Sequence, residues 1–224
     1  MVLYWERLSP AERIDRAKIQ LIKTAPYRAW AGGLFGYLAG FLQAVEEGGR
    51  EAELLVLCPF CYNVLKRVQL FLSQNPDKAE TLSLYLRDEY GELPDFLRVR
   101  VLHPLELLNP SALKGKAGRE LSGLKVAPYY GCMLLRPKEI AIDDPENPSG
   151  MDSLLEAVGA SVVDYPFKSE CCGAHLVVSN PSLTGEKCAR LLREAAERGA
   201  NARVTPCPLC WYNLRNAPAR AGLR

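Results

Sequence analysis

Five of the eight cysteines of this 224-residue chain form an ordered set in its second half, and this set constrains the fold strongly. We call it the five-cysteine set; it comprises Cys132, Cys171, Cys172, Cys207 and Cys210. The two gaps between its groups, 38 and 34 residues, each fit one or two strand–helix units. The five side chains can therefore converge where several strands end at one edge of a sheet.

Strand patterns and helix patterns alternate along the chain. Short β-branched or apolar runs predict strands at 53–57, 97–103, 123–132, 161–166 and 203–207. Capping residues and apolar spacing predict helices at 9–22, within 29–45, at 58–72, from 76 onward, and at 151–159 and 181–198. This alternation is typical of an α/β protein whose sheets are mainly parallel.

A weak internal repeat suggests two related halves. The stretch "VLCPFCYNVL" resembles "VTPCPLCWYNL", and both read as a strand, a CPxC motif and a helix. The polar, glycine-containing segment 109–123 has the composition of a linker between them. We therefore predict two pseudo-repeated Rossmann-like halves, residues 1–110 and 111–224, with the site at the C-terminal strand ends between them.

The adjacent pair Cys171-Cys172 is the least usual part of the set. Neighbouring side chains on an extended chain point to opposite sides, which suits neither a mutual disulfide nor two ligands on one small ion. Five sulfurs also exceed what one tetrahedral Zn²⁺ or an ordinary four-cysteine iron–sulfur cube takes. A cluster with several irons offers each thiolate a different iron, and Gly173 would leave room for its bulk.

A single zinc site is the alternative interpretation of the cysteines. It would use the two CPxC pairs, Cys58 with Cys61 and Cys207 with Cys210. That site gives no role to the other three members of the five-cysteine set. Cys188 lies outside both interpretations, because helical spacing places it on one face with Leu191 and Ala195, as a core residue.

Several stretches of the second half resemble the B subunit of heterodisulfide reductase. They are "YYGCMLLRP", "DDPENP", "SECCGAHLVVSNP" and "TPCPLCWYNL", and together they look like that family's second cysteine-rich CCG motif. The resemblance implies one noncubane [4Fe-4S] cluster held by the five-cysteine set: Cys132, Cys171, Cys172, Cys207 and Cys210. It also implies an oxidoreductase component that takes electrons from an iron–sulfur C subunit and a flavin-containing A subunit, and reduces a disulfide.

The first half departs from the family's two-motif pattern. Only Cys58 and Cys61 remain there, and Ile22-Lys23 stand where the first paired cysteines would fall. We expect a naturally reduced, single-cluster relative, in which Cys58 and Cys61 are a second redox pair, a metal-binding pair or a remnant. His175 follows the paired cysteines closely and is a candidate proton donor to a leaving thiolate. A pure electron-relay or assembly subunit is the competing function.

Charge and hydropathy limit the binding partners and the cell compartment that we expect for this chain. A formal net charge of +2 gives no support for binding to nucleic acid or an anionic membrane. The most apolar run, residues 29–45, is interrupted by glycines and short for a membrane span, so we expect no membrane insertion. The charged start does not read as a signal peptide, and eight cysteines fit a reducing compartment, so we expect the cytoplasm.

Overall fold

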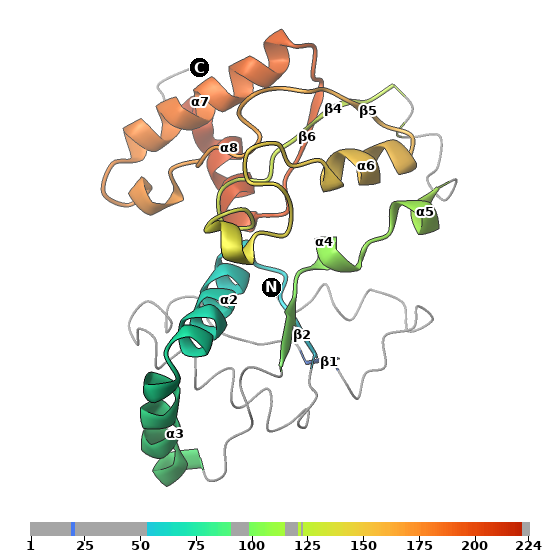
Figure 1. The fold of residues 1–224 in the computed structure, drawn as a ribbon. Coiled ribbons are helices and arrows are strands. Elements are labelled where there is room, and N and C mark those ends of the chain that lie inside the picture. Colours follow the sequence, from blue (N-terminus) through green and yellow to red (C-terminus); the bar gives the residue numbers. More distant parts are fainter. Residues whose placement is uncertain (1–18, 21–52, 91–98, 115–120, 122, 221–224) are drawn as a thin grey trace. The chain divides into compact units, whose positions relative to one another are not determined.

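The computed structural model describes residues 19–20, 53–90, 99–114, 121 and 123–220 (Figure 1). The helix predicted within 29–45, the positions Ile22-Lys23 and most of the helix predicted at 9–22 lie outside these residues. The described chain falls into two compact units. Unit 1 contains residues 1–57 and 61–104, and unit 2 contains residues 58–60 and 105–224.

Unit 1 is built on a parallel sheet with strand order β1-β2-β3. The strands are β1 (Ile19–Gln20), β2 (Glu53–Leu55) and β3 (Arg100–Leu102), and Leu54 pairs with Val101 across the last two. After β2 the chain enters α2 (Pro59–Gln74), which buries Tyr62, Leu65 and Leu72 on one face. The helix α3 (Pro76–Tyr90) follows directly.

One prediction for unit 1 is wrong. The sequence pattern places Ile19 and Gln20 in a helix ending near Ile22, but they form β1 and pair in parallel with Glu53 and Leu54 of β2. The N-cap pattern at residues 9–12 is a local signal, whereas the pairing involves residues more than 30 positions away. Sheet pairing of this kind overrides local helix propensity.

Unit 2 has its own parallel sheet, with β4 in the centre of the order β5-β4-β6. The strands are β4 (Lys125–Pro128), β5 (Ser161–Val162) and β6 (Ala202–Val204). The longer helices are α6 (Gly150–Ala157), α7 (Pro181–Glu197) and α8 (Pro208–Arg220). Four short segments complete the described elements: α4 (Pro104–Leu107), α5 (Pro110–Leu113), η3 (Lys138–Ile140) and η4 (Ala174–Leu176).

The core of unit 2 contains the cysteines. Side chains from β4, α7 and α8 form one buried group, which includes Ala127, Tyr129, Cys188, Leu191 and Leu214 together with three of the five-cysteine set. The residue after Tyr129, Tyr130, packs in a second buried group with Leu135 and Met151. The predicted α/β class with parallel sheets is confirmed.

The strand, CPxC and helix order recurs in both units, as β2 with α2 and as β6 with α8. This recurrence is consistent with two related halves, and the repeat itself stays a prediction. Within the described part of the chain, no helix combines the length and the apolar character needed to cross a membrane.

Candidate metal centre

The five-cysteine set lies in the loops and helix start that follow the three strands of unit 2. Cys132 comes four residues after β4 rather than within it, Cys171 and Cys172 come after β5, and Cys207 and Cys210 come after β6. The strands are parallel, so their C-terminal ends lie at one edge of the sheet. The N–H groups of Tyr130 and Gly131 also donate to the Lys168 carbonyl, at 2.8 Å and 3.2 Å. This contact brings the segments of Cys132 and Cys171 together.

The five thiols form two hydrogen-bonded groups. Cys132 bonds Cys171 in one group, while Cys210 bonds both Cys172 and Cys207 in the other. The two adjacent cysteines therefore face different partners, as expected for neighbouring side chains. No disulfide joins any of the eight cysteines, all of which lie in the described residues.

Hydrogen bonds rather than burial decide where negative charge is favoured. The bond from Cys132 lowers the pKa of Cys171 to about 5 although burial opposes it. The bond from Cys210 likewise lowers the pKa of Cys172 to about 7, again against burial. The same bonds raise the pKa values of the donors Cys132 and Cys210, because each donor would become a second negative charge beside an existing one.

The donor set fits a cofactor with several metal atoms better than a single ion. In the described ranges, no group of three or more cysteine, histidine or acidic side chains is arranged to hold one metal ion. Five thiols in two adjacent groups match the donors of a multi-iron cluster, in which different thiolates bind different irons. The zinc alternative would join Cys61 of unit 1 to thiols of unit 2, and it stays an alternative.

Two glycines shape the backbone around the sulfurs. Gly173 follows the cysteine pair and is left-handed, with φ of 79°. A side chain there would point toward Thr184 and Lys187 of α7, so the structure gives a conformational reason for this glycine, and its role beside a cofactor stays a prediction. Gly131 was not identified from the sequence: its φ is 68°, and an added Cβ would lie 3.0 Å from the Cys210 sulfur.

The predicted proton donor lies beside the first cysteine of the pair. His175, in η4, is exposed, and its Nδ1 atom is 3.9 Å from the Cys171 sulfur. The N–H of Gly173 donates to the same sulfur at 3.3 Å. Cys171 therefore has both a backbone donor and a titratable side chain next to it.

Four side chains that hold the cysteine pair were not predicted to do so. Tyr129, Thr184 and Cys188 donate to backbone carbonyls of residues 170–173, and Asn213 donates to the Cys172 sulfur. Cys188 is fully buried, as predicted, but its hydrogen bond to the site was missed. The sequence signal was the four-residue spacing of Thr184 and Cys188, which places both on one helical face.

The acidic loop 143–147 has a structural role. Asp143 accepts hydrogen bonds from the N–H groups of Ser149 and Gly150 and from the Tyr130 hydroxyl, and so caps the start of α6. Asp144 accepts from the N–H groups of Glu146 and Asn147 in a tight turn. These backbone bonds lower the pKa of Asp144 and keep its carboxylate charged.

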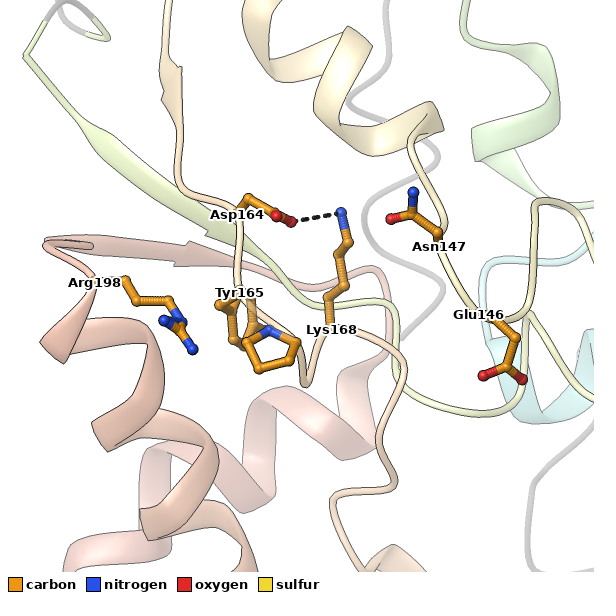
Figure 2. A pocket seen from close by; sticks show the side chains of 7 residues that line it. Glu146, Asn147, Asp164, Tyr165, Lys168 and Arg198 are labelled. Carbon is orange, nitrogen blue, oxygen red and sulfur yellow. Dashed lines mark ion pairs between the residues drawn. The ribbon is translucent and has the colours of Figure 1, made fainter.

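An open pocket of about 350 Å³ lies in unit 2, beside the segment that leads to the paired cysteines. Figure 2 shows Lys168 reaching toward Asp164 in this pocket, with a separation of 3.2 Å between the charged atoms. The other lining residues are Glu146, Asn147, Tyr165, Pro166 and Arg198. Each charged residue of the lining has an opposite charge nearby. Lys168 itself pairs with Asp152 and Asp164, and these two carboxylates explain how it is buried without loss of its charge.

Cys58 and Cys61 fall on opposite sides of the division between the units. Cys58 is half-buried and belongs to unit 2, whereas Cys61 is buried and belongs to unit 1. A hydrogen bond from Cys210 is the main cause of the lowered pKa of Cys207, and the charge of Cys58 opposes it. Cys58 therefore lies within electrostatic range of the five-cysteine set.

Comparison with known proteins gives one family for the C-terminal part. The cysteine-rich CCG domain matches residues 126–215, which contain the whole five-cysteine set. The B subunit of ferredoxin:CoB-CoM heterodisulfide reductase from Methanosarcina mazei is 32% identical over 169 residues, covering 71% of this chain and 55% of that protein. The B subunit of a ferredoxin/F420H2-dependent CoB-CoM heterodisulfide reductase from Methanosarcina acetivorans is 33% identical over 172 residues, covering 74% and 56%.

A relative from another reductase extends the comparison. The 8-methylmenaquinol:fumarate reductase membrane anchor subunit of Wolinella succinogenes is 38% identical over 107 residues, covering 47% of this chain and 38% of that protein. The chain thus spans about half the length of the curated relatives it matches, or less.

A solved structure shares the fold. A hypothetical protein from Helicobacter pylori matches with a TM-score of 0.60 at 13% identity, over 84% of this chain and 34% of that one. Taken with the placement of the cysteines, residues 126–215 match the cysteine-rich CCG domain family, and the chain is similar to the B subunits of heterodisulfide reductase.

Proposed function

We propose that this chain is an iron–sulfur electron-transfer subunit of a multisubunit oxidoreductase, and that its five-cysteine set holds one noncubane [4Fe-4S] cluster. One observation carries the proposal. The adjacent residues Cys171 and Cys172 bond different thiol partners, one in each of the two hydrogen-bonded groups of the five-cysteine set. Thiols divided in this way suit a cofactor whose irons lie apart.

The bound cluster would supply one-electron transfer and an iron that can take a sulfur ligand. The protein's own groups have separate tasks. Cys172, Cys207 and Cys210 are buried and keep water away, whereas Cys171 lies at the more exposed side, next to His175. Reduction of a disulfide to two thiols takes two electrons and two protons, and we assign to His175 the delivery of a proton beside Cys171.

The relatives' names suggest the source and destination of the electrons. The Methanosarcina proteins are components of heterodisulfide reductases. We infer that electrons reach this chain from an iron–sulfur protein resembling the family's C subunit, supplied in turn by a flavin-containing protein resembling its A subunit, and leave to a disulfide or another acceptor. We place the complex in the cytoplasm, because eight cysteines without a disulfide among them fit a reducing compartment.

A second function is favoured by one relative. The Wolinella protein is named as part of a fumarate reductase, so a similar cysteine-rich sequence occurs in a reductase for a different substrate. A chain that only relays electrons would bind the same cluster and have no disulfide site. The acceptor of the purified complex distinguishes the two functions, because only the first reduces a disulfide when given a chemical electron donor.

The cofactor is tested on the full chain, purified or reconstituted without oxygen. We expect about four irons and a brown protein with an electron paramagnetic resonance signal on oxidation or reduction. Cys172→Ser should lower the iron content while the protein stays folded. Stoichiometric zinc without iron, or about eight irons per chain, would contradict the proposal.

A further inference from the structure

Side chains from α7 and from the residue just after β4 fix the backbone of the cysteine pair. The Tyr129 hydroxyl donates to the Glu170 carbonyl at 2.6 Å. One turn apart on α7, Thr184 donates to the Gly173 carbonyl and Cys188 donates to the Cys172 carbonyl, both at 3.2 Å. The backbone of the pair is therefore held on both sides.

Asn213 acts on a sulfur instead of the backbone. Its Nδ2 atom donates to the Cys172 sulfur at 3.5 Å, and both residues are only 2% exposed. Asn213 lies three positions after Cys210 on α8, so the helix presents an amide donor and a thiol to the same sulfur. A hydrogen bond at such a buried place is electrostatically stronger than one in water.

We propose that Asn213 is a positioning residue that sets the reduction potential of the cofactor held by the five-cysteine set, through its hydrogen bond to Cys172. The proposal rests on the function proposed above. Reduction adds negative charge, which spreads onto the ligand sulfurs. A fixed donor next to one sulfur stabilises the reduced state more than the oxidised state and so raises the potential.

The test compares two amide-to-leucine variants of the full chain. Asn213→Leu removes the donor while keeping a similar volume. Asn216→Leu is the matched control, because Asn216 lies one turn further along α8 and donates to the Tyr212 carbonyl, away from the cysteines. Both are reconstituted without oxygen, their iron is counted, and the midpoint potential is measured by a titration followed by electron paramagnetic resonance.

We expect all three proteins to bind the same iron. Asn213→Leu should bind the electron about tenfold more weakly, which is a midpoint lower by ~59 mV for a one-electron couple. Asn216→Leu should match the unaltered protein. A midpoint in Asn213→Leu that equals or exceeds the unaltered value, with full iron, would overturn the proposal.

A second variant decides the matter if Asn213→Leu binds no iron. Asn213→Gln keeps an amide to fill the site but displaces its donor by one methylene from the position 3.5 Å from the Cys172 sulfur, which weakens the bond, so we expect bound iron and a lowered midpoint. An unchanged midpoint, or iron loss in this variant as well, would overturn the assignment and leave Asn213 a purely structural residue. The function proposed above fails separately, if the unaltered chain itself takes up no iron.

Discussion

Replacing Cys188 tests whether its thiol is structural or is a ligand of the proposed cofactor. This cysteine is fully buried in α7, and its sulfur donates to the Cys172 carbonyl at 3.2 Å. We compare Cys188→Ala with Cys172→Ser. The first variant removes a contact to the backbone of the pair, whereas the second removes one of the proposed ligands.

The expected cost of Cys188→Ala follows from two losses. The Cys172 carbonyl loses a buried hydrogen bond, which costs about 1 kcal/mol because a thiol is a weak donor. The missing sulfur leaves a small cavity beside Leu191, which costs about 1 kcal/mol more. A loss of about 2 kcal/mol lowers Tm by about 4–8 °C in a chain of this size. Cys188→Ser keeps a donor and should lose less.

The assay uses cluster-free protein kept reduced, unfolded by heat and followed by circular dichroism. Iron is then counted after reconstitution without oxygen. Cys188→Ala should unfold earlier and still bind about four irons, whereas Cys172→Ser should lose iron. Equal iron loss in the two variants would refute the reasoning, because Cys188 would then be a ligand. An unchanged Tm in Cys188→Ala would refute the energetic part.

Three further predictions concern other parts of the chain. Burial lowers the pKa of His103 from 6.5 to about 4, so the folded state resists protonation of this side chain. The free energy of unfolding should therefore fall by about 3 kcal/mol as the pH drops from 6.5 to 4. In acid unfolding, His103→Gln should lose this pH dependence. Asp143→Ala removes the acceptor at the start of α6 and should cost about 2 kcal/mol in urea unfolding, with an unchanged midpoint counting against the capping role. The double variant Cys58→Ser/Cys61→Ser should retain about four irons on reconstitution, and iron loss would make the pair ligands.

Local signals predicted much of the secondary structure. Asn180-Pro181 marks the start of α7, where the Asn180 side chain accepts from the Leu183 N–H at 3.0 Å. The start of α3 at Pro76 was predicted in the same way. The strand β1 could not be predicted from local signals, because its conformation depends on pairing with β2, which is far away in the sequence. Strand lengths were overestimated for the same reason, since apolar runs extend beyond the paired residues.

For the site, spacing predicted that the cysteines lie after strand ends but not which thiols contact each other. The pairing of Cys171 with Cys132, and of Cys172 with Cys210, depends on how the loops after the strands approach each other. Donors such as Asn213 were missed for a related reason. A polar residue on a helix is usually exposed, and only the packing of α8 shows that this one is buried.

The strand order of unit 2 has a consequence for how the protein matures in the cell. The central strand, β4, is synthesised first, while β6 and the start of α8, with the last two cysteines, are synthesised last. At about 5–20 residues per second, the ribosome adds the segment between Cys132 and Cys210 in roughly 4–15 s. During this time the thiols of Cys132, Cys171 and Cys172 lack the two cysteines that complete the set. The five-cysteine set is therefore complete only once the last segment of unit 2 has been synthesised, so a cofactor that needs all five thiols cannot be fully held before then.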